Sequence, residues 1–268
     1  MANLAQHQSN NIVKLLLIGD SGSGKTGSLA SLAKVGYKLR ILDFDNGLDI
    51  LAKQLADTPA ALNNVLYSTL TDKWKSSAGK PIIDGVPKAF ATGLNLLDKW
   101  EDGTKASDWG ADTILVLDSL TFASSACLRN VLFMNGRANQ QPQLQDWGAA
   151  MDIIESLLAL LYSESIKCNV VVISHISYIE RDDGTSRGYP STLGAKLPPK
   201  VGRYFNSILL VKSSGSGAAT KKIIRTSTEG LIDLKHPAMG KIPIELPVET
   251  GLATFFEAVV GKANLPAK

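Results

Sequence analysis

The sequence predicts an α/β protein with a mostly parallel, doubly wound sheet and an antiparallel C-terminal edge. Short apolar runs alternate with helical patterns along most of the chain, as in repeated strand–helix–strand units. A glycine-rich loop, residues 19–24, joins the first apolar run directly to the first helical pattern. In the last third, two β-rich runs instead flank a Gly/Ser turn, which is typical of a hairpin.

The expected elements follow in chain order. The first strand spans residues 12–18, the first helix about 25–35 and the second strand 39–44. Further strands are expected at 65–70, 113–117, 169–174 and 207–211, and helices at 88–100, 122–134 and 147–162. The hairpin joins 208–213 to 221–225, and an edge strand at 231–234 and a closing helix at 252–260 follow it. Residues 72–87 and 134–146 are expected to be loops, because they contain Gly, Pro and polar residues.

Composition excludes several classes of protein. The chain has 268 residues, 44% hydrophobic and 20% charged, which excludes disorder or coiled coil as a whole-chain description. Its net charge of +3 is too small to identify a nucleic-acid binder. Cys127 and Cys168 lie in apolar contexts, as buried thiols of a reducing compartment do. With neither a signal pattern nor an 18-residue apolar run, we expect a cytoplasmic protein without membrane association.

We expect a single domain over residues 12–262. A flexible N-terminal lead at 1–11 precedes it and a C-terminal tail at 263–268 follows it. Neither an internal repeat nor a clear linker divides the chain.

The strongest motif lies between the first strand and the first helix and matches the pattern G-x-x-x-x-G-K-[ST]. Its residues are Gly19, Asp20, Ser21, Gly22, Ser23, Gly24, Lys25 and Thr26. Small residues at this spacing let successive backbone N–H groups surround a phosphate. We expect Lys25 to reach the β- and γ-phosphates and Thr26 to bind Mg²⁺. A Gly/Ser-rich turn with a chance lysine is the alternative, which the flanking strand and helix disfavour, so the sequence predicts binding of ATP and Mg²⁺.

An acid ends the apolar strand at 113–117. Asp118 stands where a phosphate-loop fold needs a carboxylate beside Thr26 to hold the water shell of Mg²⁺. The alternative role for Asp118 is to cap the helix that follows. Ser119 occupies the next position, where helicases and terminases usually place a catalytic Glu, so the catalytic acid must lie elsewhere.

Two further strand ends carry candidate catalytic groups. Asp43 and Asp45 close the second strand, where alternation puts both on one face, and either could polarise the attacking water. The residues Asp45-Asn46-Gly47 also suit a simple turn. His175 follows the strand at 169–174, at the place of a γ-phosphate sensor, and a structural capping role is its alternative.

With these residues the chain resembles the RecA-like P-loop ATPase superfamily, and most closely the small phage ATPases of the Sak type, which act in single-strand annealing. The resemblance covers about residues 12–234. It implies that Asp45 is the catalytic acid, one methylene shorter than the usual Glu, that Asp118 is the Walker B acid and that His175 is the sensor. It also implies that the segment from 194 onward offers a cation to the ATP of a neighbouring subunit, for which Lys196, Lys200 and Arg203 are the candidates.

The same resemblance implies that residues 176–199 face single-stranded DNA. Five cations and two acids lie between Arg181 and Arg203, and tyrosines add stacking faces. The candidate DNA-binding residues are Arg181, Arg187, Tyr189 and Lys196, together with Tyr178. Gly184 and Gly188 are expected to make the segment mobile. A solvated surface loop is the alternative, and a weaker second loop contains Arg137 and residues 139–145. The four tryptophans are expected in the core or at its rim.

These features lead to one functional hypothesis and two alternatives. The chain is expected to be an ATP- and Mg²⁺-dependent ATPase that binds single-stranded DNA and promotes annealing or recombination in phage DNA metabolism. The resemblance implies a homo-oligomer and a single-strand binding protein as a further partner. One alternative is a nucleotide-switched loader or packaging accessory that binds a protein rather than DNA. A small-molecule kinase is disfavoured because we find no Arg-rich lid.

Overall fold

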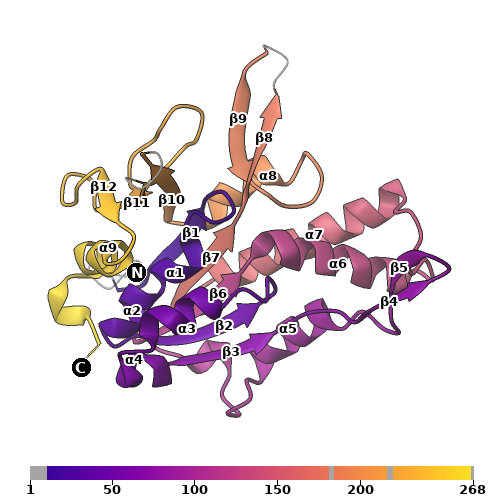
Figure 1. Cartoon of the computed structure of the whole chain (residues 1–268), viewed down its shortest axis with the longest axis horizontal. Coiled ribbons are helices and arrows are strands. Elements are labelled where there is room, and N and C mark those ends of the chain that lie inside the picture. Colours follow the sequence, from indigo (N-terminus) through magenta and orange to yellow (C-terminus); the bar gives the residue numbers. More distant parts are fainter. Residues whose placement is uncertain (1–10, 181–183, 216–219, 267–268) are drawn as a thin grey trace, which may run out of the picture.

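The computed structural model describes residues 11–180, 184–215 and 220–266, and its backbone is drawn in Figure 1. The predicted N-terminal lead lies almost entirely outside these residues, as does the end of the predicted C-terminal tail. The domain boundaries at 12 and 262 therefore stay a prediction.

The centre of the molecule is an eight-stranded sheet in the order β12-β11-β10-β1-β7-β6-β2-β3. Six neighbouring strands are parallel: β1 (Lys14–Ile18), β2 (Lys38–Asp43), β3 (Val65–Thr69), β6 (Thr113–Asp118), β7 (Asn169–Ser174) and β10 (Ser207–Ser214). The remaining two, β11 (Lys221–Arg225) and β12 (Glu245–Pro247), add an antiparallel edge beside β10. The predicted fold class is confirmed.

Helices cover both faces of this sheet. The first face packs against α1 (Lys25–Ser28), α2 (Ala30–Lys34), α3 (Asp49–Leu55), α4 (Pro59–Asn63) and α9 (Gly251–Val260), and the second against α5 (Ala89–Asp98), α6 (Leu120–Met134) and α7 (Leu144–Tyr162) (Figure 1). Alternation along β1 illustrates the two layers, because Leu15 and Leu17 join the first core and Leu16 and Ile18 the second. Strands buried on both faces read as continuous apolar runs, which is why the sequence located them.

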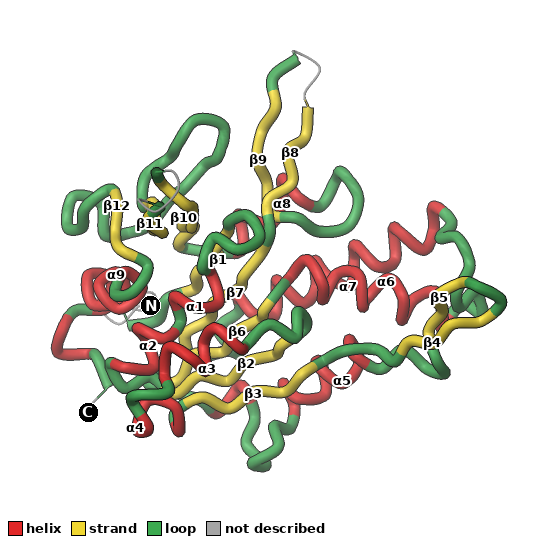
Figure 2. Tube along the Cα trace, viewed as in Figure 1, coloured by secondary structure: helices red, strands yellow, loops and turns green. Residues whose placement is uncertain are grey.

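Two hairpins lie outside the central sheet, one at each of two projecting ends in Figure 2. The first pairs β4 (Trp74–Ser77) with β5 (Lys80–Ile83), and the second pairs β8 (Ile176–Glu180) with β9 (Ser186–Pro190). Helix α8 (Pro198–Val201) follows β9. Both segments were expected to be loops, so the structure corrects these expectations. All four residues of β4 are exposed, and a strand without a buried face leaves no alternating apolar pattern to detect. Gly188 lies within β9 against Ile232, which seats that hairpin on a distant segment.

Further corrections concern the C-terminal edge and the short helices. Residues 231–234, expected to be the third edge strand, make only isolated bridges, and β12 takes that place. Thr228 explains the difference, because its hydroxyl both donates to the Leu234 carbonyl at 3.2 Å and accepts from the Leu234 N–H at 3.1 Å, which closes a loop. The sequence missed α3 and α4, and the helix expected at 25–35 divides at Leu29. Helices α6 and α7 begin two and three residues earlier than expected.

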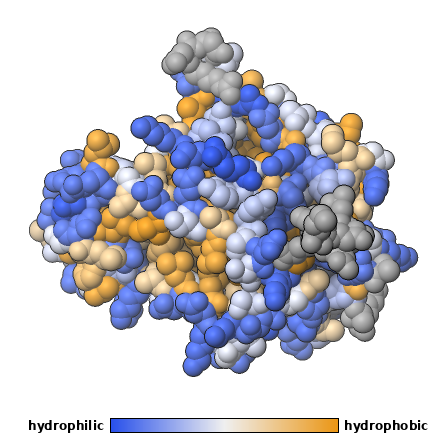
Figure 3. All heavy atoms as spheres, turned by 180° about the vertical axis from the view of Figure 1, so that it is seen from behind, coloured by the Kyte–Doolittle hydropathy of each residue, from blue (hydrophilic) through white to orange (hydrophobic). Residues whose placement is uncertain are grey.

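The surface combines hydrophilic residues with smaller apolar areas, as Figure 3 shows for the face opposite that of Figure 1. Apolar atoms contribute more than half of the surface of ordinary folded domains, so scattered apolar areas need no special explanation. Within the described parts of the chain, no helix has both the length and the apolar character needed to cross a membrane.

Candidate active site

The predicted catalytic residues come from four parallel strands and meet at the carboxyl edge of the sheet. Lys25 follows β1, Asp45 follows β2, Asp118 ends β6 and His175 follows β7. The strand order places β1, β7, β6 and β2 side by side, so these groups, scattered over 150 residues of sequence, share one edge. Ligands bind at this edge in open α/β sheets.

Glycine is required at the start of the phosphate loop. The Gly19 N–H donates to the Ser174 carbonyl at 3.2 Å, and a Cβ on Gly19 would lie 2.3 Å from the Val211 carbonyl oxygen of β10. Gly22 and Gly24 have φ values of 75° and 107°, in the region that disfavours residues with a side chain. The loop is therefore clamped between two strands, in a shape that only these glycines allow.

Lys25 is 6% exposed and points back over its own loop. Its Nζ donates to the carbonyl of Gly19 at 2.7 Å and to that of Asp20 at 2.8 Å. Burial lowers the pKa of Lys25, while Asp118 and Asp45 oppose that shift. A buried cation held only by neutral carbonyls gains most from an anionic ligand, so this position fits a phosphate group.

Thr26 and Asp118 form the candidate metal site. The Thr26 hydroxyl donates to Asp118 Oδ2 at 2.7 Å, and burial raises the pKa of Asp118 to about 7. Within the described residues, the second oxygen, Oδ1, is buried without a hydrogen-bond partner. A hydroxyl beside an unsatisfied buried carboxylate fits a divalent cation, which supplies charge neutralisation at the phosphate oxygens when bound. The capping alternative is not observed, because Ser119 is the N-cap of α6 and that helix has no side-chain cap bond.

Asp45 is held by the residue that follows Asp118. Its Oδ1 accepts from the Ser119 N–H at 3.0 Å and from the Ser119 hydroxyl at 2.6 Å. Asp43 has other partners, since it accepts from the Thr69 hydroxyl at 3.2 Å and from the Gly47 N–H at 3.4 Å. Strand β2 ends at Asp43, so the alternation used to place both acids on one face ends there as well. Asp45 is thus the acid that is held against Ser119, next to Asp118.

His175 lies beside this acid, with Nε2 3.7 Å from Asp45 Oδ2. Burial and the charge of Lys25 lower the pKa of His175, so the imidazole is neutral near pH 7. Its backbone N–H donates to the Thr121 hydroxyl at 3.1 Å, and its carbonyl accepts from the Ser191 N–H at 2.8 Å. A strand, β8, follows His175 directly, so the residue does not cap a helix.

The candidate DNA-binding residues lie on or after the β8–β9 hairpin, except that Arg181 falls outside the described residues. Arg187 forms an ion pair with Asp233, which reduces its free charge. Tyr189 lies opposite Ser177 in the hairpin. Tyr178 is 58% exposed, and Lys196 is exposed in the loop between β9 and α8.

The three candidate trans-acting cations differ in their surroundings. Lys200 donates to Glu155 at 3.1 Å, and Tyr204 donates to the same carboxylate at 2.9 Å. In the part of the chain that the structure describes, neither Lys196 nor Arg203 has an acidic side chain within ion-pair distance, and both are exposed. Lys200 is therefore committed within its own chain, while Lys196 and Arg203 form no ion pair with the residues that the structure describes.

Several residues near the site were not identified from the sequence. A Cβ on Gly24 would lie 3.1 Å from the Lys222 side chain and 3.5 Å from that of Val248, and a Cβ on Gly27 would lie 3.1 Å from Gln54. These come from β11, the segment after β12 and α3, and nothing in their local sequence marks them. Ser119 did carry a signal, the absence of Glu after Asp118, but its bonding to Asp45 depends on strand order.

The weaker second loop has a structural explanation. Arg137 pairs with Asp146, which also accepts from Asn135 at 2.8 Å and from the Gln143 N–H at 2.8 Å. Asp146 is fully buried in the first turn of α7, where Gln143 and Asp146 form a capping box. The charge of Arg137 is therefore used to hold the start of this helix.

The comparison with protein families agrees with this geometry. The sequence profile of an AAA domain family, AAA_24, matches residues 11–237. The chain is similar to a KaiC-like protein from the hyperthermophilic archaeon Pyrococcus horikoshii OT3, with 10% identity and a TM-score of 0.45, over 88% of this chain and 84% of that one. It is also similar to the flagellar accessory protein FlaH from Methanocaldococcus jannaschii, with 11% identity and a TM-score of 0.45, over 89% and 87%. No curated protein matches the chain.

Proposed function

The chain belongs to the AAA_24 family of AAA domains and is a P-loop ATPase, and from this premise we propose that it hydrolyses ATP with Mg²⁺, binds single-stranded DNA and promotes strand annealing or recombination in phage DNA metabolism. The proposal has three parts, of which assembly is taken last. The first concerns the roles of the residues at the sheet edge, and the second the hairpin that follows His175.

The hydrolytic roles follow from charge and position. Lys25 holds the β- and γ-phosphates, and Thr26 with Asp118 holds Mg²⁺. Asp45 acts as the base or orienting group for the attacking water, because Ser119 occupies only its Oδ1 and Oδ2 is directed toward His175. His175, neutral near pH 7, donates a hydrogen bond to Asp45 or to the γ-phosphate.

The observation that carries the DNA-binding part is the continuous connection from Asp45 to the β8–β9 hairpin. His175 contacts Asp45 with its imidazole, and its carbonyl accepts from Ser191 at the other end of the hairpin. The Thr121 hydroxyl donates to the Ser191 carbonyl at 3.1 Å and accepts from the His175 N–H. The base of the hairpin is thus fixed to the residues that would sense the γ-phosphate. Such a projecting hairpin with exposed Tyr178 suits a nucleotide-controlled contact with a single strand.

The first experiment measures the ATPase rate with Mg²⁺, with and without single-stranded DNA, for the wild type and for Lys25→Ala. We expect DNA to stimulate the wild-type rate, and the variant to lose both activity and stimulation. A basal rate that is indifferent to DNA while ATP still binds contradicts the DNA-binding part. Such a result favours the second candidate, a nucleotide-switched accessory, and capture of a replication or packaging protein would then be sought.

The second experiment locates the DNA-binding surface. Arg187→Ala and Lys196→Ala are expected to weaken binding of an oligothymidylate and to reduce the slope of log K against log salt by about 1 for each phosphate that the substituted cation neutralises. Lys38→Ala is the matched control, because Lys38 is an exposed cation in an ion pair with Asp112 at the opposite end of β2. Unchanged slopes remove Arg187 and Lys196 from the site.

The third part of the proposal is assembly. We propose that copies of the chain associate so that Lys196 or Arg203 reaches the nucleotide of a neighbour, and that a single-strand binding protein is a further partner. Mixing Lys25→Ala with Arg203→Ala protein tests the first statement. Partial recovery of activity in the mixture supports Arg203 as the cation that acts in trans. The same mixture made with Lys196→Ala in place of Arg203→Ala tests Lys196. If the ATPase rate of each mixture is only the sum of the rates of its two variants, the proposal of a cation acting in trans is contradicted.

A further inference from the structure

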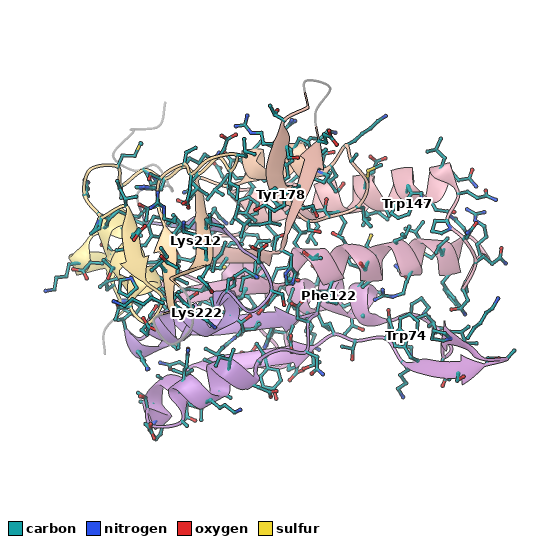
Figure 4. All side chains as sticks on the ribbon, turned by 45° about the horizontal axis from the view of Figure 1, so that its top comes forward. Trp74, Phe122, Trp147, Tyr178, Lys212 and Lys222 are labelled. Atoms are coloured by element: carbon teal, nitrogen blue, oxygen red, sulfur yellow. The ribbon has the colours of Figure 1, made fainter. Side chains whose placement is uncertain are left out.

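A cavity of about 320 Å³ opens at the end of the molecule that carries the β4–β5 hairpin. Figure 4 shows Trp74 at that end and Lys222, which borders the phosphate loop, at the other. The cavity lies between the hairpin, the last turns of α6 and the loop that follows α6. The side chains that the argument uses are those of Trp74, Ile83, Arg129, Asn139 and Gln140. This cavity plays no part in the ATPase site.

Trp74 is 56% exposed, unlike Trp100 and Trp109, which are buried as the sequence led us to expect. An isolated two-stranded hairpin is marginally stable in water, so this one depends on its contacts with the rest of the chain. The Ile83 N–H donates to Asn139 Oδ1 at 2.8 Å, and the Ile83 side chain is buried. The hairpin is therefore anchored through β5, while β4 holds the indole ring at the mouth of the cavity.

Arg129 fixes the chemistry of this mouth. Its Nε donates to Asp72 Oδ2 at 2.8 Å, and its guanidinium lies 5.7 Å from the centre of the Trp74 ring. The Asp72 side chain is fully buried, and its Oδ1 accepts from the Ala89 N–H at 3.0 Å. The guanidinium is thus held at a set position over the aromatic ring. Such a pair offers a stacking face and the remaining guanidinium N–H donors to a ligand, while Asp72 balances the charge of Arg129.

The segment that carries the β4–β5 hairpin is basic. Residues 72–88 contain four lysines and two aspartates. Both acids are already paired, Asp72 with Arg129 and Asp84 with Lys75 at 2.7 Å. The other three lysines of the segment are exposed: Lys73, Lys80 and Lys88. Trp74, Pro81 and Ile83 line the cavity, so Lys73 and Lys80, each one position away from a lining residue, lie on the other face of the hairpin. An exposed aromatic ring at the mouth of a partly apolar cavity, on a hairpin whose other face is basic, suits the bases and phosphates of a single strand.

We propose that this cavity binds a nucleobase of single-stranded nucleic acid, stacked on Trp74, and that the adjoining phosphates cross the hairpin to its basic face, which carries Lys73 and Lys80. The amides of Asn139 and Gln140 in the wall offer donors and acceptors to the edge of the base. The inference rests on the proposed function and adds a second binding surface to it, separate from the β8–β9 hairpin. Prolines in the wall would also suit an extended peptide, but the exposed lysines of the hairpin favour a polyanion.

The test measures binding of a fluorescein-labelled oligothymidylate by anisotropy, using the full chain. Trp74→Ala is expected to weaken binding about 5- to 150-fold, the range for removal of one stacking partner, while Trp74→Phe retains most of the affinity. Tyr67→Ala is the matched control, because Tyr67 is also 56% exposed but lies on β3. Lys73→Ala and Lys80→Ala are expected to reduce the salt slope, and Trp74→Ala to leave it unchanged. The basal ATPase rate confirms that each variant is folded.

The outcomes separate this inference from the proposed role of the β8–β9 hairpin. If Arg187→Ala weakens binding and Trp74→Ala binds as tightly as the wild type, the cavity is excluded and the role of the hairpin stands. If Trp74→Ala weakens binding and the hairpin variants do not, the cavity is supported and the role of the hairpin fails. If oligothymidylate does not bind the wild type, both fail. Quenching of Trp74 fluorescence by a proline-rich peptide but not by the oligonucleotide also overturns the inference.

Discussion

The carboxylate of Asp45 is bound twice by Ser119, through the N–H at 3.0 Å and the hydroxyl at 2.6 Å, and both bonds go to Oδ1. Ser119 directly follows Asp118, so the candidate water-orienting acid and the candidate metal-binding acid are fixed to one another through a single residue. The neighbouring strands β2 and β6 bring these residues together, with Asp43 in register with Asp118. The shorter side chain of Asp, compared with Glu, is thus combined with a partner that sets its direction.

Replacement of Asp45 by Asn should lower kcat about 10²- to 10⁴-fold, the usual contribution of a general base, and change the KM for ATP little. The amide keeps the shape of the side chain but cannot accept a proton. Steady-state kinetics with saturating Mg²⁺ measure the effect. An unchanged kcat would show that Asp45 has no part in the hydrolytic step.

Replacement of Ser119 by Ala should lower kcat about 10-fold, because one charge-assisted hydrogen bond to Asp45 is removed while the backbone bond remains. Ser119 is a positioning residue, so the KM for ATP should stay the same and Ser119→Thr should restore the rate. If Thr fails to rescue and the KM rises as kcat falls, the role of Ser119 lies in binding rather than in orientation.

Removal of the Thr26 hydroxyl should act on the metal rather than on the nucleotide. In Thr26→Val, the Mg²⁺ concentration that gives half of the maximal rate should rise at least about 10-fold, since one ligand is absent, while ADP binding in the presence of a chelator stays unchanged. Thr26→Ser keeps the hydroxyl and serves as the control. Equal Mg²⁺ requirements for Thr26→Val and the wild type would remove Thr26 from the metal site.

A methyl group at Gly19 should distort the phosphate loop. The Cβ would lie 2.3 Å from the Val211 carbonyl oxygen and 2.7 Å from the Ser23 hydroxyl, and the backbone of β10 cannot move away cheaply. Gly19→Ala should therefore destabilise the protein by about 1–3 kcal/mol and abolish nucleotide binding. Gly148→Ala is the control, because a Cβ there has nothing within 4 Å and the residue lies in α7, so about 0.5–1 kcal/mol of stabilisation is expected. Denaturant unfolding measures both, and a stable, ATP-binding Gly19→Ala protein would contradict the clamp.

Lys14 should give the protein a stability that increases at alkaline pH. This lysine is 6% exposed and donates to the carbonyls of Leu161 and Ile166 at 2.9 and 2.8 Å, and burial lowers its pKa from 10.5 to about 8. Between about pH 8 and 10.5 the unfolded chain binds more protons than the folded one, so the free energy of unfolding rises with pH in that window. From about pH 7.5 to about pH 10, the wild type should gain about 2 kcal/mol relative to Lys14→Met.

Urea unfolding at the two pH values measures this gain. The comparison with Lys14→Met removes the contributions of the other groups that titrate in the same range. If the difference in unfolding free energy between the two proteins is equal at both pH values, the lysine has an ordinary pKa and its burial does not disfavour the charged form.

Much of the site was predictable because its signals are local. The phosphate loop depends on glycines at fixed spacing between a strand and a helix, and both neighbours were visible as apolar periodicity. Asp118 could be recognised as the acid at the end of a buried strand, and the structure brings it to Thr26. The resemblance to a P-loop ATPase is confirmed by the family match, while the finer resemblance to phage annealing proteins stays part of the proposal.

Other features depend on interactions between distant segments. The hairpin of β4 and β5 carries no buried alternation along β4, and the hydrogen bond that fixes it, from Ile83 to Asn139, spans 56 residues. Trp74 was expected in the core or at its rim because tryptophan is usually buried, yet its hairpin holds it in solvent over a cavity.

By itself, the sequence determined that buried parallel strands alternate with helices, and that one strand end carries a phosphate loop, since hydrophobic period and glycine spacing are properties of neighbouring residues. Only the tertiary structure decided which strand ends adjoin. The order β1, β7, β6, β2 places Asp45 against Ser119 and His175, although these residues are 74 and 130 positions apart along the chain. Strand order follows from the packing of helices on both faces of the sheet, a balance summed over the whole core that no short segment encodes.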